Sequence, residues 1–160
     1  MPRLVVVLPL TPLRVGSSFA VPAWPLHITV LPPFLTDAPT DEIAAAIAAA
    51  TRVHPPLTAV AGRNELFGRR HDIPVALIEP NDQLTALHRT LVDAIRPFAA
   101  APDEPAFTGP GFRAHVTHKP PATVQPGDTL TLTQIALVDM LPRTHAAGRT
   151  VLAAHPLGPS

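Results

Sequence analysis

Proline is the residue that most limits what this chain can fold into, because it occupies 22 of the 160 positions and is spread along the whole length. A proline cannot continue a helix, and it cannot donate a hydrogen bond in the middle of a sheet. This argues against a long helical bundle and favours short strands mixed with short helices. The length suits one domain with a substantial core, and we expect residues 1–160 to form a single domain of two lobes.

Apolar periodicity between the prolines predicts strand, strand, helix, strand, strand, and then helix, strand, strand, strand. This order divides the chain into two α+β halves, each with one helix. The strands are predicted at residues 5–8, 26–31, 57–60, 73–78, 112–119, 130–138 and 150–154, with one helix capped by Thr40 and ended by Pro55-Pro56 and another at 81–96. We expect Pro32-Pro33 to end the second strand, residues 62–70 to form a polar loop, and residues 99–111 to be the least ordered.

Two stretches repeat the pattern histidine, β-branched residue, threonine, two further residues and Pro-Pro. They are His27-Ile28-Thr29-Val30-Leu31-Pro32-Pro33 and His115-Val116-Thr117-His118-Lys119-Pro120-Pro121. In a strand, residues i and i+2 share a face, so each stretch presents a histidine and a threonine side by side and turns the β-branched residue into the core. Two imidazoles and two hydroxyls that face one cleft can carry out acid–base chemistry on a phosphate.

A single His-x-Thr pattern is weak, because a chain of this composition contains about one such match by chance. His88-Arg89-Thr90 is such a match. It lies in a segment with helical spacing of apolar residues, where side chains at i and i+2 diverge. We therefore expect His88 to lie on the flank of a helix and to take no part in the site.

Composition narrows the class of partner. Lys and Arg together number 12, as do Asp and Glu, so there is no broad electrostatic footprint for long nucleic acid. The absence of cysteine excludes disulfides, a thiolate nucleophile and a Cys-type zinc site. The apolar run Leu4–Leu8 is too short for a signal peptide or a membrane span. We expect a soluble, cytoplasmic monomer with no membrane partner.

The chain resembles the 2H phosphoesterase superfamily, and within it the bacterial 2′,5′-RNA ligase-like branch. The likeness rests on both His-x-Thr motifs, on the Leu66-Phe67-Gly68 loop followed by Val75-Ala76-Leu77-Ile78, on the helix between the motifs, and on the closing Leu157. It implies an α+β fold of two antiparallel-sheet lobes related by a pseudo-twofold axis, with a metal-free cleft between them. It also implies that His27 and His115 are catalytic and that Thr29 and Thr117 bind phosphate oxygens.

Acid–base chemistry of the paired histidines agrees with that implication. Opening a 2′,3′-cyclic phosphate needs one group to take a proton from water and another to give one to the departing ribose oxygen. Histidine, with an ordinary pKa of about 6.5, can hold either state near neutrality. The scheme requires no cofactor and no metal. His115 and His118 stand three apart, and on a strand they face opposite ways, so a metal pair is not expected.

Two positions depart from the family pattern. His118 stands where an apolar residue is usual, and Pro120 stands where many relatives carry an arginine. By strand parity Arg113 and Lys119 share the face of His115, so either can replace that charge, and Arg113 is favoured for its planar fork. The alternative is that both are solvated charges at strand ends.

Base stacking is a further prediction. Phe34 and Trp24 are candidates for stacking on a base, as is Phe112. The chain has only seven aromatic residues, and each of them more often belongs to the core than to a binding site.

The function we favour is hydrolysis of a 2′,3′-cyclic phosphate on a nucleotide or an RNA end to a 2′-phosphate, with a role in RNA processing. The same histidine pair can run the reverse reaction as a 2′,5′-RNA ligase, because both directions share one transition state. A third class is a non-catalytic module that binds nucleotides or RNA ends. Two titratable groups argue against that class, since binding alone does not require them.

Overall fold

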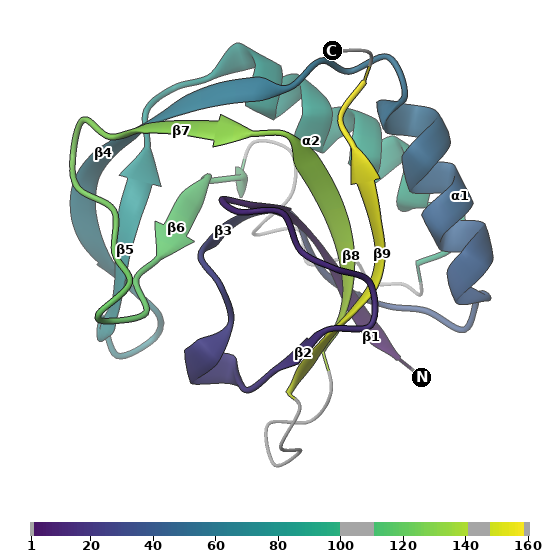
Figure 1. Ribbon diagram of the computed structural model, residues 1–160, viewed down its shortest axis with the longest axis horizontal. Coiled ribbons are helices and arrows are strands. Elements are labelled where there is room, and N and C mark those ends of the chain that lie inside the picture. The colour runs from purple at the N-terminus through teal and green to yellow at the C-terminus, as the bar shows by residue number, and fades with distance from the viewer. Residues whose placement is uncertain (1, 100–110, 141–147, 159–160) are drawn as a thin grey trace.

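The computed structural model describes residues 2–99, 111–140 and 148–158. They form one antiparallel sheet in the order β2-β9-β8-β1-β3-β6-β5-β4-β7, together with two α-helices (Figure 1). The strands are β1 (Arg3–Pro9), β2 (Ser18–Phe19), β3 (His27–Leu35), β4 (Leu57–Phe67), β5 (Ile73–Ile78), β6 (His115–Thr117), β7 (Thr129–Leu132), β8 (Gln134–Met140) and β9 (Arg149–Pro156). The helices are α1 (Thr40–Thr51) and α2 (Asp82–Ile95), with a 3-10 turn at Val21–Ala23.

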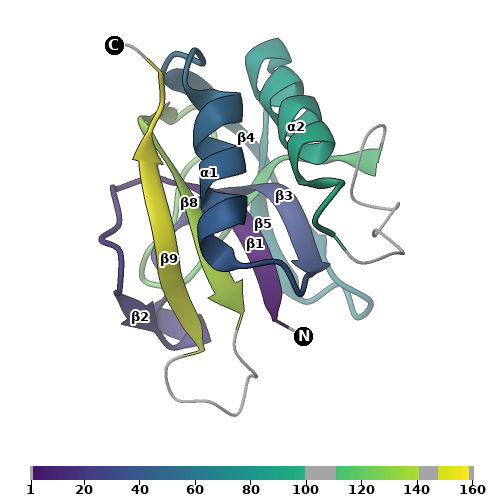
Figure 2. The ribbon, with the colours of Figure 1, turned by 90° about the vertical axis from the view of Figure 1, so that its right-hand side faces the viewer.

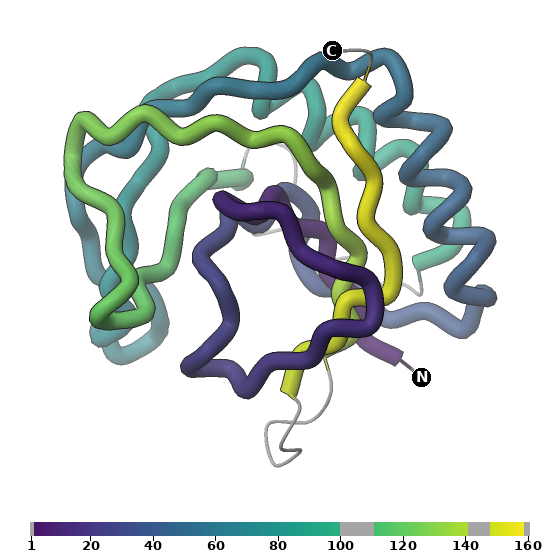
Figure 3. The backbone as a smooth tube through the Cα atoms, viewed as in Figure 1, coloured from purple at the N-terminus to yellow at the C-terminus, as the bar shows by residue number. Residues whose placement is uncertain are grey.

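The sheet curls round on itself. Only Thr133 separates β7 from β8, although β7 is the edge strand beyond β4 and β8 lies between β9 and β1. The backbone N–H of Leu157 donates to the carbonyl of Thr133 at 2.9 Å, which fastens the end of β9 to this corner. The tube in Figure 3 shows the chain running from β7 directly into β8. One face of the sheet is therefore inner and the other is outer.

Both helices pack on the outer face, side by side (Figure 2). The sheet contributes Ile28, Val30 and Val116 to the main core, all fully buried. The helices contribute Ile43, Ile47, Leu84, Leu87, Leu91 and Ile95. Each such side chain stabilises the fold by about 1.5–3 kcal/mol relative to an exposed one. Among the helices in the described part of the chain, none combines the length and apolarity needed to cross a membrane.

The inner face carries a second, smaller core. Val5 and Val7 of β1 pack there with residues of β8 and β9, and with Leu13 and Trp24 from the segment that links β1 to β3. This segment, which includes β2 and the 3-10 turn, covers part of the inner face. The alternation along β1 explains the division, because Leu4, Val6 and Leu8 belong to the main core and Val5 and Val7 to the smaller one.

Prediction of where β3 ends was wrong, because the strand runs through Pro32-Pro33 to Leu35. Between the pairs Leu4↔Phe34 and Val6↔Leu31 the register shifts, so the two prolines occupy an irregularity opposite Val5. Prolines are tolerated at such bulges because no ladder hydrogen bond is required of them.

Further boundaries also differ from prediction, and the strand predicted at 112–119 is confined to His115–Thr117 (β6). Residues 62–67 continue β4 instead of forming a loop, with Asn64 and Glu65 paired to Ala76 and Val75 of β5. The polar side chains in this part of the strand do not prevent strand formation, because much of it is exposed to solvent. The strand predicted at 130–138 is divided at Thr133, because its two parts pair with different neighbours at the corner of the sheet.

Helix boundaries agree closely with prediction, but one cap differs. Asn81 caps α2, and its Oδ1 accepts from the backbone N–H of Leu84 at 3.0 Å. Thr40, the predicted cap of α1, is instead the first helical residue, after Pro39. Asp41 and Glu42 in the first turn still favour this end of the helix through its dipole. The predicted disordered segment 99–111 lies almost wholly outside the described residues.

Candidate active site

The two predicted motifs lie on neighbouring strands at the centre of the sheet. β3 and β6 pair antiparallel with Ile28 opposite Val116. Continuing this register by one residue each way sets His27 opposite Thr117 and Thr29 opposite His115. Since Ile28 and Val116 face the helices, the four motif side chains face the inner side. Each motif therefore supplies the threonine that stands across from the histidine of the other.

This register brings the four side chains within reach of one small ligand. Directly opposed residues in an antiparallel pair have Cβ atoms about 4.5–5.5 Å apart, and diagonal neighbours are about 7–8 Å apart. His27 and His115 occupy a diagonal, as do Thr29 and Thr117. A tetrahedral phosphate between the histidines can therefore be approached by one imidazole from each side.

Both imidazoles are held in the same way. Nδ1 of His27 lies 2.8 Å from the carbonyl of Pro25, and Nδ1 of His115 lies 2.9 Å from the carbonyl of Arg113. Each carbonyl belongs to the residue two positions before the histidine. Because a carbonyl can only accept a hydrogen bond, the neutral ring donates from Nδ1 and carries its proton there. Nε2 of each histidine is left as the atom that can accept or deliver a proton.

An aromatic ring and an arginine stand beside each histidine. In the first triplet, the ring centroid of Trp24 is 3.9 Å from that of His27, and the guanidinium carbon of Arg149 is 5.2 Å from the Trp24 centroid. We call Arg149, Trp24 and His27 the closed triplet, because their exposures are only 6 %, 7 % and 9 %. Such buried contacts restrict how the imidazole can turn.

The second triplet has the same composition and a looser environment. Phe67 meets His115 edge-on with centroids 4.7 Å apart, and the guanidinium carbon of Arg113 is 4.9 Å from the Phe67 centroid. We call Arg113, Phe67 and His115 the open triplet, because its histidine and its phenylalanine are half-buried and its arginine is exposed. Arg113 also forms an ion pair with Glu65 at 2.8 Å.

Burial makes both imidazoles weaker bases than usual. Loss of solvent lowers the pKa of His27 to about 4, against the hydrogen bond to Pro25, and the positive charges of Lys119, His115 and Arg149 lower it further. Burial also lowers the pKa of His115, against its hydrogen bond to the Arg113 carbonyl, and the guanidinium of Arg113 adds to the lowering. His27 is thus the more strongly held in the neutral state.

The threonine hydroxyls are available to a ligand. Thr29 and Thr117 are half-buried, and within the described residues neither hydroxyl has a hydrogen-bond partner. A hydroxyl can donate to a non-bridging phosphate oxygen, and this pair would reach the phosphate from the diagonal that the histidines leave open.

Of the two candidate phosphate cations, Arg113 is already engaged with Glu65 and Phe67. Lys119 begins a tight turn in which its backbone N–H and carbonyl bond Ala122 at 3.0 and 2.8 Å. Its positive charge contributes to the lowered pKa of His27.

The residues predicted to stack on a base are not exposed platforms. Phe34 is buried in the main core, at the far end of β3 and about 20 Å along the strand from His27. Trp24 is buried against His27 as part of the closed triplet. Phe112 stacks in parallel on His88, 4.0 Å away.

The two other histidines singled out in the sequence lie elsewhere. His88 is on α2 as predicted, but it is fully buried instead of lying on the helix flank, with Nδ1 2.8 Å from the carbonyl of Val30. Nε2 of His118 lies 3.1 Å from Oδ1 of Asn64. Across residues 2–99, 111–140 and 148–158, no group of three or more His, Cys, Asp or Glu is arranged to hold a metal ion.

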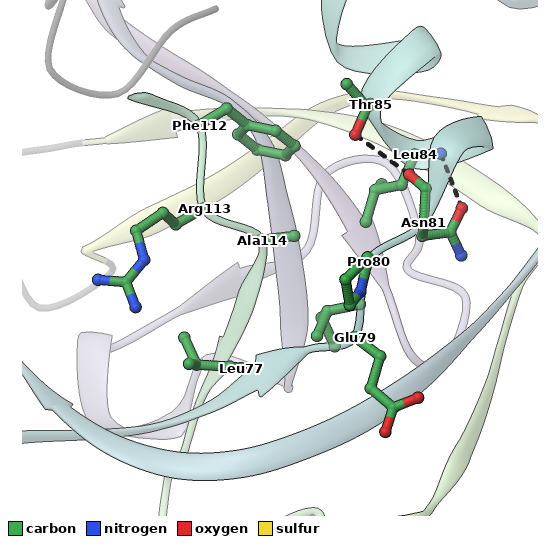
Figure 4. A pocket seen from close by; sticks show the side chains of 10 residues that line it. Leu77, Glu79, Pro80, Asn81, Leu84, Thr85, Phe112, Arg113 and Ala114 are labelled. Atoms are coloured by element: carbon green, nitrogen blue, oxygen red, sulfur yellow. Dashed lines mark hydrogen bonds between the residues drawn. The ribbon is translucent and has the colours of Figure 1, made fainter. Parts of the chain in front are cut away.

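A cavity of about 200 Å³ adjoins the site without containing either motif histidine. It lies between the end of β5, the start of α2 and residues 112–114 (Figure 4). The Asn81 and Thr85 side chains are engaged with the helix end itself, as the dashed lines show. The motif face, and not this cavity, holds the groups that can move protons.

Solved structures share this fold. Escherichia coli LigT complexed with NADP+ superposes with a TM-score of 0.60 at 18% identity, over 99% of this chain and 98% of that chain. LigT complexed with 3′-AMP gives 0.60 at 20% identity, over 98% and 99%. The protein TT0787 of Thermus thermophilus gives 0.61 at 20% identity, over 97% of each. These likenesses confirm the predicted fold. No curated protein matches the chain by sequence.

The curled antiparallel sheet and the duplicated His-x-Thr motifs define a protein of the 2H phosphoesterase type. The model of the 2′-5′ RNA ligase superfamily matches residues 6–145. The chain belongs to this superfamily, which confirms the resemblance seen in the sequence.

Sequence reasoning singled out the four motif residues but not the surroundings of the histidines. Trp24 was singled out for a different role, Phe67 only as part of a family loop, and Arg149 not at all. Arg149 and Trp24 are 125 positions apart, so no local pattern could join them.

Proposed function

We propose that this protein is a metal-independent phosphodiesterase that hydrolyses 2′,3′-cyclic phosphates of nucleotides or RNA ends to 2′-phosphates. One observation carries the proposal: two imidazoles stand diagonally across the β3–β6 pair, each with Nδ1 bonded to a carbonyl and Nε2 left for chemistry. Two such groups on opposite sides of a phosphate meet the need of an in-line displacement for one base and one acid.

We assign the role of general base to His27 because it is the histidine more strongly held in the neutral form. It is more buried and faces more positive charge than His115, so it enters the reaction neutral. Its Nε2 takes a proton from water while the water oxygen forms a bond to phosphorus. His115, protonated, gives its Nε2 proton to O3′ as the P–O3′ bond breaks. The products are a 2′-phosphate and a free 3′-hydroxyl, and a proton passes from His27 to His115 to restart the cycle.

Stabilisation of the charged phosphate falls to the remaining groups of the inner face. Thr29 and Thr117 donate hydrogen bonds to the non-bridging oxygens. Lys119 supplies positive charge that also acts on His27, and Arg113 forms an ion pair with Glu65. Charge-assisted hydrogen bonds of this kind are each worth about 1.5–3 kcal/mol.

Several other observations agree with a small nucleotide substrate. LigT, a structural relative, has been crystallised with NADP+, with 3′-AMP and with ATP. The net charge of zero offers no wide basic surface for long nucleic acid. A cytoplasmic role in RNA processing as a monomer is part of the same proposal.

The same site can join a 2′,3′-cyclic phosphate to a 5′-hydroxyl, which makes a 2′,5′-RNA ligase the second candidate. The hydroxyl takes the place of water, and the roles of the histidines are unchanged. A non-catalytic module is the third candidate, and it predicts tight binding of nucleotides without turnover.

The deciding experiment supplies each of the four nucleoside 2′,3′-cyclic phosphates in the presence of EDTA and identifies the products by ³¹P NMR. We expect 2′-monophosphates at an undiminished rate when EDTA is added. A requirement for added metal would contradict the mechanism, and bound but unchanged substrate would favour the non-catalytic module. A parallel reaction with RNA ends carrying a cyclic phosphate and a 5′-hydroxyl tests for ligation.

A further inference from the structure

Each motif histidine is fastened by one hydrogen bond and by one ring. The hydrogen bond from Nδ1 to the carbonyl two residues earlier fixes where Nδ1 lies. It does not by itself prevent a small swing of the imidazole about the side-chain torsions χ1 and χ2. Such a swing moves Nε2, the atom on which proton transfer depends, and misplacement by about 1 Å can cost on the order of 100-fold in rate.

In the closed triplet, Trp24 blocks this swing. Its ring is 3.9 Å from the imidazole of His27 and tilted by 31° to it, which is close enough for the indole to lie along the face of the imidazole. Arg149 reaches Trp24 from β9 and is itself held, since its Nη1 donates to the carbonyl of Gly148 at 2.8 Å. A side chain at Gly148 would come within 3.0 Å of the carbonyl oxygen of Phe19, so glycine allows β2 to close over this support.

We propose that Trp24, supported by Arg149, is a positioning residue that holds Nε2 of His27 in line with the phosphate, and that Phe67 is its weaker counterpart for His115. The inference rests on the proposed function, because it assigns a role within that reaction. Each aromatic ring acts through the imidazole that it contacts. The paired arrangement of arginine, ring and histidine on both sides of the β3–β6 pair is what points to this role.

Packing explains why the two supports differ in strength. Trp24, in the segment that links β1 to β3, is buried against β1, β8 and β9, whereas Phe67 is half-buried at the end of β4 and meets His115 by its edge at 64°. The charges that act on His27 come from Lys119 after β6, from His115 on β6 and from Arg149 on β9. Loss of the indole would admit water to His27 and leave these three charges unchanged.

The test compares Trp24→Leu with Trp24→Phe. Phenylalanine keeps an aromatic ring and loses the indole N–H, which has no acceptor within the described residues. We expect Trp24→Phe to stay within about threefold of wild-type kcat, and Trp24→Leu to lose about 10- to 100-fold in kcat with KM changed less than about threefold. If Trp24 only fills space, the Trp24→Leu and Trp24→Phe variants should have similar kcat values.

A second readout does not depend on turnover. Histidine titration by NMR in the unliganded protein should give His27 a pKa of about 4 in wild type and nearly the same in Trp24→Phe. In Trp24→Leu the pKa should rise towards the ordinary value of about 6.5, as the imidazole gains solvent. Correspondingly, the acid limb of the kcat/KM profile should move to higher pH.

Half-burial of Phe67 makes Phe67→Leu a variant that should fold in any case. It should raise the pKa of His115 and move only the alkaline limb, with a smaller loss of kcat. If folded Trp24→Leu keeps the wild-type kcat and the wild-type pKa of His27, the inference is overturned. If Trp24→Leu does not fold, an unchanged alkaline limb in Phe67→Leu overturns it. Wild-type protein without turnover but with these NMR shifts would refute the proposed function and support the positioning contact.

Discussion

The closed and open triplets differ in burial although the motifs at their centres are nearly identical. On one side, a tryptophan and an arginine that are both almost fully buried enclose His27. On the other, a half-buried phenylalanine and an exposed, ion-paired arginine flank His115. A duplicated motif therefore does not produce duplicated surroundings. They lower the pKa of His27 to about 4 and leave His115 closer to solvent, and this difference is the basis for the proposed roles of base and acid.

The largest expected effect comes from removing the histidines themselves. His27→Ala and His115→Ala should each lower kcat by about 10²–10⁴-fold, because each removes one proton transfer. The double variant should be little worse than either, since the pair works as a unit. His71→Asn is a suitable control, because His71 is exposed and its φ of 51° is one that asparagine tolerates. Activity that survives in either single variant would refute the assignment of that residue.

The pH dependence of kcat/KM tests whether the two histidines act as an acid–base pair. His27 must be neutral, which requires a pH above its pKa of about 4, and His115 must be protonated, which requires a pH below its own lowered pKa. We therefore expect a bell with its optimum on the acid side of 6.5 and about a tenfold loss per pH unit beyond each limb. A profile that is flat between pH 5 and pH 8 would contradict the acid–base pair.

The free energy of unfolding should depend on pH because His27 is buried in its neutral form. Between about pH 6.5 and pH 4 the unfolded chain protonates His27 while the folded protein does not, so the free energy of unfolding falls as the pH is lowered. This window corresponds to about 3 kcal/mol for His27 alone. Chemical denaturation at several pH values should show a smaller slope for His27→Gln, with a residual slope from His88 and His115, whose pKa values burial also lowers. An unchanged slope in His27→Gln would show that His27 is not buried in the neutral form.

Replacing the two cations separately tests which one holds the phosphate. Lys119→Gln should lower kcat/KM by a factor equivalent to about 1.5–3 kcal/mol of lost transition-state stabilisation, as expected for a charge-assisted hydrogen bond. Arg113→Gln should lower it by the equivalent of under about 1 kcal/mol. Arg69, exposed in the turn after β4, offers a control through Arg69→Gln. The reverse order of effects would return Arg113 to the role that its planar fork first suggested.

The smallest effect should come from Glu65→Gln. The pair with Arg113 is exposed, so its loss should change stability by no more than about 0.2–1 kcal/mol. In the Lys119→Gln background, however, releasing Arg113 should recover part of the lost kcat/KM, since the guanidinium is then free to turn towards the phosphate. Steady-state kinetics of the single and double variants would check this, and no recovery would mean that Arg113 acts only on its own side of the site.

Much of the fold could be predicted because it rests on local signals. Asn81 and the apolar spacing after it locate α2, and the alternation of residues before each Pro-Pro pair locates the motif strands. The direction of the motif side chains follows from the alternation of side chains along a strand. For this reason His27 and Thr29 could be assigned to one face of β3 from the sequence. The extension of β3 through Pro32-Pro33 could not be predicted, because only the bulge opposite Val5 makes it possible.

The remainder of the site depends on contacts between distant parts of the chain. The burial that distinguishes His27 from His115 arises where Trp24 meets β9, and although Trp24 is close to His27 in the sequence, its partner Arg149 is 125 positions beyond Trp24. The ion pair that occupies Arg113 likewise joins β4 to the segment before β6. Strand parity alone could therefore name Arg113 and Lys119 as candidates but could not rank them.

The pairing of Ile28 with Val116 has a consequence for regiochemistry. An antiparallel pair has a local twofold axis through its centre, so the frame of two histidines and two threonines looks almost the same after half a turn. A cyclic phosphate is itself nearly symmetric between its O2′ and O3′ bonds. The frame alone therefore gives no preference for which of the two bonds breaks. The choice of product must come from what lies outside the frame, where the enclosed tryptophan on one side and the solvent-facing phenylalanine on the other make the two orientations unequal.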